Sequence, residues 1–181
     1  MPNDIVIGLQ YGDEGKGKIV NHLLKNNNYT FCVKTNGGPN AGHTIYKDKQ
    51  KIVLHQLPIG AADKDTKCLI GPNCVIDMTK LENEIKMVEE FISFDNDNHI
   101  KKRLYLSQNA HVIKPEHIEE DCNTDKIGST KCGIRPAYRA KYNRSGTRIK
   151  DLQLNQEWNV VDSYKVLNPT SNDESILFEI S

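Results

Sequence analysis

The chain has 181 residues, enough for one domain with a single core and too few for two well-packed ones. Its 24 lysines and arginines balance its 24 aspartates and glutamates, which argues against a basic nucleic-acid-binding protein and against an acidic disordered tail. The five cysteines include no C-x-x-C pair, no apolar run approaches the roughly 18 residues that span a bilayer, and the amino terminus lacks signal-peptide features. We therefore expect one cytoplasmic domain over 1–181, with free thiols and no nucleic-acid or membrane partner.

Short β-branched runs alternate with polar, glycine-containing or helical stretches along the chain. These runs are DIVIGLQ (4–10), FCVKTN (31–36), KIVLHQLP (51–58), CLIGPNCVID (68–77), RLYLS (103–107) and SILFEIS (175–181). Strands that alternate with helices are typical of parallel sheets. The pattern predicts an α/β fold with a largely parallel central sheet and flanking helices.

The stretch GDEGKGK (12–18) lies between the first predicted strand and an expected helix, GKGKIVNHLLKNN. Clustered glycines let successive backbone N–H groups turn toward an anion, while the helix start and the lysines add positive charge. Lys18 is placed to reach a phosphate, and Lys16 is a second cation. A glycine-rich turn without a ligand is the alternative. Strand, loop and helix together favour phosphate binding in a P-loop-NTPase-like fold.

The stretch departs from the phosphate-loop pattern G-x-x-x-x-G-K-[ST] at its last position. Ile19 stands where a hydroxyl would bind magnesium. A hard cation between phosphates still needs oxygen ligands, and the nearest carboxylate candidate in the loop is Asp13. Backbone N–H groups, lysines and a metal would all favour its charged form, so Asp13 can serve as a base as well as a ligand.

A second glycine-dense turn, TNGGPNAGHTI (35–45), follows the strand FCVK. It holds Asn40 and His43 among small residues, which let a flat ligand approach the backbone. A lone histidine is usually structural, but a strand-end loop without apolar neighbours favours a functional His43. His55 alternates with Val53 and Leu57, so we interpret it as a strand position.

The clearest helix is expected over 79–94. Four apolar residues recur there at spacings of four, three and four, namely Leu81, Ile85, Val88 and Ile92. Thr79 and Glu82 fit a capping box that opens the helix. Met87 and Phe91 are expected to pack in the core.

QYGDEGKGKIV together with NGGPNAGHT resembles the amino-terminal signature of the adenylosuccinate synthetases, which join aspartate to inosine monophosphate (IMP) using GTP. Further segments resemble the family in the same order, namely LHQLPIG, NAHVIKPEH and GSTKCGIRPAYRAKYNRSGTRIKDL. The likeness covers about residues 4–152. It implies a GTP-dependent carbon–nitrogen ligase of purine biosynthesis, with Mg²⁺ as cofactor and IMP and L-aspartate as substrates.

The resemblance also implies roles for single residues. Asp13 would be the general base that removes the purine N1 proton, and would bind Mg²⁺ with the backbone carbonyl of Gly42. His43 would be the general acid. The GTP-binding residues would be Gly12, Asp13, Glu14, Gly15, Lys16, Gly17, Lys18, Gly42, His43 and Thr44. The IMP-binding residues would be Asp13, Glu14, Gly15, Lys16, Asn40, Ala41, Gly42, His43, Thr130 and Arg144, the last from the partner subunit of a homodimer.

Two features depart from the family pattern. Arg135 stands where the family has glycine in Gly-Ile-Gly-Pro-Ala-Tyr, and would distort the IMP-phosphate contacts if the position needs a positive φ. ESILFEIS resembles the start of the family's Ile-Leu-Phe-Glu-Gly-Ala-Gln-Gly segment but stops at Ser181. After Asp151 the short stretch QLNQEWNVVDSYKVLNP resembles the compact, archaeal-type members of the family. We therefore expect a truncated chain of this type, without the regions that bind aspartate and read guanine.

Three hypotheses follow for the function. The first is adenylosuccinate synthesis, with IMP favoured over dGMP because Asp13 is replaced in the family's phage relative. The second is a catalytically silent nucleotide-binding remnant or interaction subunit. The third, an unrelated P-loop phosphotransferase, is disfavoured by Ile19 and by the second glycine-rich turn.

Overall fold

The computed structural model describes residues 3–10, 14–47, 50–92, 99–123, 130–167 and 175–180. Its main sheet has seven strands, each parallel to its neighbours, in the order β1-β9-β2-β5-β6-β8 with β7 beside β5. They are β1 (Asp4–Ile7), β2 (Phe31–Gly37), β5 (Lys67–Ile76), β6 (Leu104–Ser107), β7 (His111–Val112), β8 (Asn159–Val161) and β9 (Ile176–Ile180). The predicted α/β fold with a parallel sheet is confirmed.

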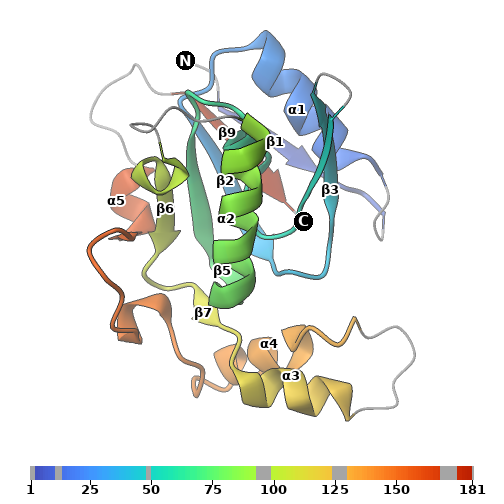
Figure 1. Cartoon of the computed structure of the whole chain (residues 1–181). Coiled ribbons are helices and arrows are strands. Elements are labelled where there is room, and N and C mark those ends of the chain that lie inside the picture. Colours follow the sequence, from blue (N-terminus) through green and yellow to red (C-terminus); the bar gives the residue numbers. More distant parts are fainter. Residues whose placement is uncertain are drawn as a thin grey trace.

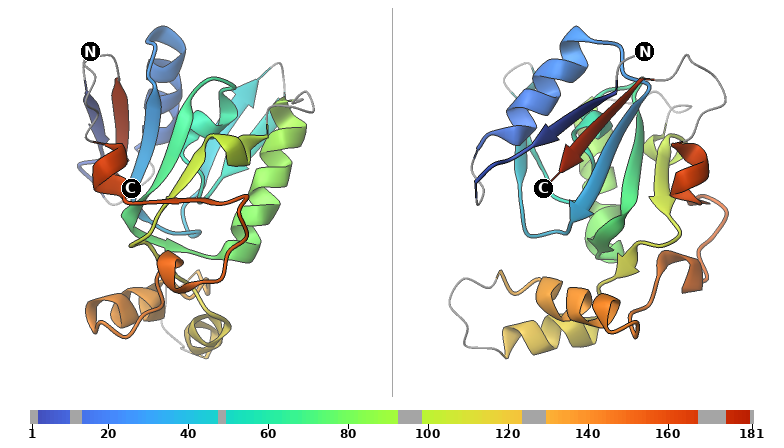
Figure 2. Two further views of the ribbon diagram at one scale, coloured as in Figure 1. Left: turned by 90° about the vertical axis from the view of Figure 1, so that its left-hand side faces the viewer. Right: turned by 180° about the vertical axis from the view of Figure 1, so that it is seen from behind.

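A second, antiparallel sheet and five helices complete the regular structure of the described residues. They are β3 (His43–Lys47), β4 (Gln50–Leu54), α1 (Lys16–Asn26), α2 (Met78–Ile92), α3 (Pro115–Cys122), α4 (Ile134–Tyr142) and α5 (Ser163–Val166), with short 3₁₀ turns at Ile59–Ala62, Ile100–Lys102 and Ile149–Asp151. Helices α1 and α2 and the β3–β4 sheet lie on one face of the main sheet (Figures 1 and 2). Helices α3 and α4 pack against each other beyond β7 (Figure 1).

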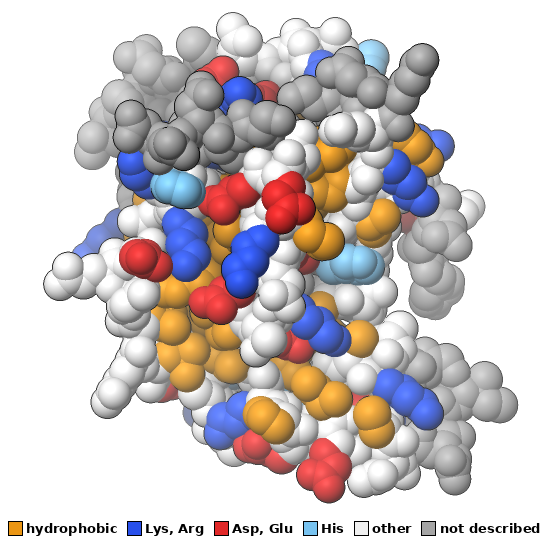
Figure 3. All heavy atoms as spheres, viewed as in Figure 1, with side chains coloured by type: hydrophobic (Ala, Val, Ile, Leu, Met, Phe, Trp, Pro, Cys, Tyr) orange, Lys and Arg blue, Asp and Glu red, His pale blue; other side chains and the backbone are white. Residues whose placement is uncertain are grey.

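The core lies between the main sheet and helices α1 and α2. Val20 and Leu24 of α1 share one buried cluster with Leu81 and Val88 of α2 and with Ile70 of β5. Burying each such aliphatic side chain stabilises the fold by about 1.5–3 kcal/mol. Packing against this cluster sets where α1 begins relative to the sheet. On the face shown in Figure 3, charged side chains of both signs are mixed.

Helix α2 begins one residue earlier than expected and with a different cap. The Asp77 carboxylate accepts a hydrogen bond from the Lys80 N–H at 3.0 Å, so Asp77 and not Thr79 caps the helix. Phe91 packs partly buried against the core as predicted, but Met87 is 46% exposed. The prediction for Met87 was wrong because the buried stripe of α2 runs through Leu81, Glu84, Ile85, Val88 and Ile92. The expected residues 93 and 94 lie outside the described part of the chain.

The run KIVLHQLP forms a strand only as far as Leu54, within the small sheet rather than the main one. His55 therefore lies just past β4, and its interpretation as a strand position was wrong. Arg135 lies inside α4, and it is Lys131 and Arg144 that have positive φ (54° and 58°) among the described non-glycine residues. Arg135 therefore does not adopt the positive φ that would distort the IMP-phosphate contacts.

All five cysteines are free thiols, as expected. Burial raises the pKa of the Cys68 and Cys74 thiols to about 12, so both stay protonated. Among the described helices, none combines the length and apolarity needed to cross a bilayer.

Candidate functional site

The first glycine-rich loop leads into α1 through a left-handed glycine. Gly15 caps the helix start with φ 76°, a conformation that other residues adopt only with strain. Within the described residues no side chain caps this end. The Lys18 N–H donates to the Gly15 carbonyl oxygen at 2.9 Å, and the N–H groups of Lys16 and Gly17 precede it at the helix start, where an anion is favoured. Gly12 and Asp13 lie outside the described residues, so their roles stay predictions.

Glu14 and Lys16 contact each other at the mouth of this loop. The Lys16 Nζ donates to the Glu14 carboxylate, which also accepts the Gln10 N–H at 2.5 Å. The contact with Lys16, followed by that with Gln10, lowers the pKa of Glu14. Lys16 is therefore engaged within the loop itself, whereas Lys18 lies exposed on α1. Of the two predicted cations, Lys18 is the more accessible to a phosphate.

The second glycine-rich segment meets the first where β3 packs against α1. A β-carbon built on Gly17 would lie 3.0 Å from Cβ and 3.2 Å from Nδ1 of His43. His43 is the first residue of β3 and pairs with Leu54, so the small sheet fixes its backbone. The structure thus places the predicted imidazole directly against the first turn of α1. Gly42 and Thr44 flank this contact on the same segment.

The imidazole of His43 is neutral at physiological pH. Burial first, and then the positive charges of Lys34 and Lys16, lower the pKa of His43 to about 4. Lys34 is 1% exposed, and its Nζ donates to the His55 carbonyl at 2.5 Å. A bound phosphate would add negative charge beside the ring and raise this pKa.

His55 supports the second segment from behind, a role the sequence did not reveal. Its Nδ1 lies 3.1 Å from the Ala41 carbonyl oxygen, and a β-carbon on Gly42 would lie 3.2 Å from its Cε1. The Glu84 carboxylate of α2 accepts three consecutive backbone N–H groups, those of His55 (2.8 Å), Gln56 (3.0 Å) and Leu57 (3.0 Å). Glu84 therefore positions the turn that holds Ala41 and Gly42. Nothing local in the sequence marks Glu84, because its partners lie more than 25 residues away.

Glu179 is a second buried carboxyl, on β9. Its Oε1 accepts the Ile59 N–H at 3.2 Å, and burial raises its pKa to about 7 although the charge of Lys34 opposes this. The unfolded chain releases the same proton near pH 4.5.

The contribution of Glu179 to the free energy of unfolding is therefore expected to fall as pH rises from 4.5 to 7, whereas the lowered pKa of His43 (6.5 to about 4) acts in the opposite direction. In this window the folded chain holds a proton that the unfolded chain has lost, so the contribution is complete below pH 4.5 and lost above 7. At 1.36 kcal/mol per pKa unit the ceiling is about 3 kcal/mol. Urea denaturation of the unmutated chain and of Glu179→Gln at several pH values measures the contribution of Glu179 as the difference between the two proteins. A slope of equal size in both proteins contradicts the assignment.

The predicted phosphate ligands Thr130 and Arg144 lie at opposite ends of α4. Thr130 is exposed before the helix, and Arg144 is exposed after it. Nine helical residues span about 13 Å at 1.5 Å each, so one chain does not bring the two side chains to one point. Tyr138 of α4 accepts the Gly37 N–H at 3.0 Å and so joins this region to the second glycine-rich segment.

Among the described residues, no three His, Cys, Asp or Glu side chains gather to hold a metal. This search does not bear on the predicted Mg²⁺ ligands. Gly42 would bind the metal through its backbone carbonyl, and Asp13 lies outside the described residues. Asn40 and Ala41 precede Gly42 on the segment held by His55 and Glu84. The structure thus brings segments 14–18 and 40–44 together and leaves Arg144 apart.

Comparison with known proteins gives consistent matches. A family model described as "Adenylosuccinate synthetase" matches residues 5–174. The adenylosuccinate synthetase of Chlorobaculum tepidum is 45% identical over 155 residues, which are 82% of this chain and 34% of that protein. The adenylosuccinate synthetase of Aquifex aeolicus is 41% identical over 152 residues, which are again 82% of this chain and 34% of that protein. The chain spans about one third of the length of these curated relatives.

Two solved structures share the fold over nearly the whole chain. Fully ligated adenylosuccinate synthetase from Plasmodium falciparum superposes with a TM-score of 0.80 at 26% identity, covering 97% of this chain and 50% of that one. Succinoaminodeoxyadenylate synthetase of cyanophage S-2L, bound to dGMP and dATP, gives 0.77 at 28% identity with the same coverage.

Proposed function

This chain belongs to the adenylosuccinate synthetase family, and we propose that it binds GTP with Mg²⁺ and IMP where α1 meets β3 and ligates L-aspartate to IMP. The observation that carries the proposal is the contact between Gly17 and His43, 3.0 Å from the built β-carbon to the His43 Cβ. It joins the start of α1 to a partly buried imidazole, two of the parts that phosphoryl transfer needs besides a metal and a base.

The proposed reaction has three steps. Asp13 removes the N1 proton of IMP, and the resulting O6 anion attacks the γ-phosphorus of GTP and releases GDP. The amine of aspartate then attacks C6, loses a proton and displaces inorganic phosphate to give adenylosuccinate. Mg²⁺ bound by Asp13 and the Gly42 carbonyl would neutralise phosphate charge.

His43 is suited to the transfer step because its protonation depends on the ligand. In the structure the ring is neutral, since burial and nearby lysines hold its pKa at about 4. The γ-phosphate of GTP would bring opposite charge to the ring and raise this pKa, which favours a proton on the imidazole only when GTP is bound. His43 then stabilises the charge that develops on the transferred group.

The proposal extends to a cytoplasmic homodimer. Thr130 and Arg144 are separated by the length of α4, so a phosphate bound at Thr130 would take its arginine from a partner subunit. Sedimentation velocity tests the assembly. A mixture of Thr130→Ala and Arg144→Ala chains should restore one complete site per dimer.

The proposed function is tested by supplying the chain with GTP, IMP, Mg²⁺ and aspartate. Chromatography of the products measures how much adenylosuccinate forms. Asp13→Ala and His43→Ala should each lower the rate about 10²–10⁴-fold, the usual contribution of general acid–base groups. His22→Ala is the matched control, because His22 is exposed on α1. Unchanged rates in both site variants contradict the assigned roles. Replacing IMP by dGMP tests the substrate, because the cyanophage enzyme binds dGMP.

Nucleotide binding without turnover is the second candidate. It needs only the start of α1 and the adjacent His43, which lie together among the described residues. Saturable GTP and IMP binding with no adenylosuccinate formed supports this narrower function.

A further inference from the structure

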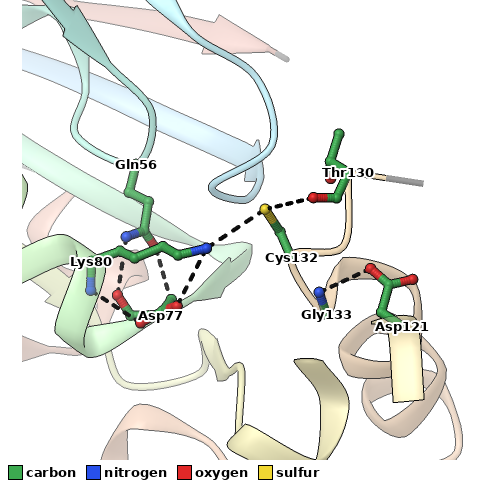
Figure 4. A network of polar contacts seen from close by, with 7 residues as sticks. All are labelled: Gln56, Asp77, Lys80, Asp121, Thr130, Cys132 and Gly133. Atoms are coloured by element: carbon green, nitrogen blue, oxygen red, sulfur yellow. Dashed lines mark hydrogen bonds and ion pairs between the residues drawn. The ribbon is translucent and has the colours of Figure 1, made fainter. Parts of the chain in front are cut away.

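Lys80 extends from the first turn of α2 toward the segment that precedes α4. Its Nζ lies 3.6 Å from the Cys132 Sγ, and that sulfur lies 3.3 Å from the Thr130 carbonyl oxygen (Figure 4). The Lys80 side chain is 47% exposed, so the ammonium group reaches solvent beside Thr130. A cation therefore stands next to a residue proposed to bind the IMP phosphate.

Lys80 also borders the second glycine-rich segment. A cavity of about 300 Å³ is lined by Pro39, His55, Lys80, Asn83, Glu84 and Met87. Pro39 directly precedes Asn40, and His55 holds the Ala41 carbonyl through its Nδ1 at 3.1 Å. The same lysine thus faces both segments assigned to IMP, one through the cavity and the other through Cys132.

The base of the Lys80 side chain is held in place. Gln56 bonds both backbone groups of Asp77, accepting its N–H at 2.8 Å and donating to its carbonyl at 3.0 Å. Asp77 in turn caps the Lys80 N–H, and its other oxygen lies 3.8 Å from the Lys80 Nζ. Figure 4 shows these contacts between the segment that follows β4 and the start of α2. The long ion-pair distance and the thiol are weak partners for an ammonium group with three donors.

We propose that Lys80 binds the 5′-phosphate of IMP at Thr130, an inference that rests on the proposed function and adds a ligand to its nucleotide site. A phosphomonoester carries close to two negative charges near neutral pH and three acceptor oxygens. It is a stronger partner for the ammonium group than the Cys132 thiol and replaces it when IMP binds. Lysine acts here as a point charge, with Thr130 as the neutral partner.

Equilibrium titration of IMP into the unmutated 181-residue chain, followed by calorimetry, tests this assignment. Lys80→Ala is expected to weaken IMP binding about 10- to 100-fold, the usual effect of losing a hydrogen bond to a charged group. Lys80→Arg keeps the charge and should stay within about threefold of the unmutated chain. Lys86→Ala, on the exposed side of the same helix, is the matched control and should bind normally. Inosine, which lacks the phosphate, should bind Lys80→Ala and the unmutated chain equally.

The outcomes separate the two claims. If IMP binds the unmutated chain and Lys80→Ala equally well, or if inosine loses as much affinity as IMP, the role of Lys80 is overturned and the proposed function stands. If the unmutated chain does not bind IMP, the proposed function and this inference both fail. Circular dichroism checks that Lys80→Ala is folded, and Lys80→Gln replaces it in the titration if it is not.

Discussion

Replacement of Gly17 by valine is expected to weaken binding of GTP with Mg²⁺ about 100-fold while the chain stays folded. Gly17 is buried in the first turn of α1, and even a β-carbon there would lie 3.0 Å from the His43 Cβ. Valine adds two further carbons, which push the helix start away from β3. Displacements near 1 Å at such sites cost about 100-fold in function. Overpacking itself typically costs about 1–3 kcal/mol of stability.

Equilibrium dialysis of labelled GTP measures the effect of Gly17→Val, and thermal unfolding checks that the variant is folded. Ile19→Ala is the control, because Ile19 is 52% exposed two residues further along α1. Affinity equal to that of the unmutated chain in Gly17→Val would show that α1 and His43 do not act on one ligand.

Replacement of Glu84 by alanine is expected to lower the free energy of unfolding by about 3–5 kcal/mol. Glu84 is 3% exposed, and its carboxylate accepts the N–H groups of His55, Gln56 and Leu57 at 2.8–3.0 Å. Alanine leaves these donors without an acceptor, and each buried unsatisfied group costs about 1–3 kcal/mol. Urea denaturation measures the loss.

A conservative variant and a surface control test this prediction further. Glu84→Gln keeps one acceptor oxygen and should lose less stability than alanine, and it serves if alanine does not fold. Glu82→Ala, exposed on the same helix, should change stability by no more than about 0.5 kcal/mol. A Glu84→Ala chain within 1 kcal/mol of the unmutated one, about the net worth of one hydrogen bond, would mean that the turn at His55 is held by other contacts.

The local features of this fold could be predicted from the sequence. The alternation of strands with helices indicated a parallel sheet, and the apolar spacing from Leu81 to Ile92 indicated the buried face of α2. Both signals are periodic, because burial of one face repeats with the geometry of the element. The two glycine-rich turns were recognisable for a similar reason, since their residue types are tied to backbone conformation.

Long-range contacts could not be predicted in this way. No periodicity tells that β9 inserts between β1 and β2, or that β3 and β4 form a sheet of their own. The cap of α2 shows the limit clearly. Asp77 and Thr79 are both good capping residues, and Gln56, 21 residues away, holds the backbone of Asp77.

The same limit applies to the site. His43 stood out by its glycine-rich surroundings, but its neutral state depends on burial and on Lys34 and Lys16 from other segments. His55 was interpreted as a strand position and Glu84 gave no signal, because the role of a positioning residue depends on what it contacts in the fold.

The central claim is that segments 14–18 and 42–44 form one nucleotide site. Titration of GTP with Mg²⁺, followed in ¹H–¹⁵N correlation spectra of the assigned chain, tests it most directly. The account predicts that the amide signals of Gly15, Gly17 and His43 shift together with one dissociation constant, while the Trp158 indole signal stays in place. Shifts confined to one segment, different dissociation constants for the two, or no shift at either would contradict it.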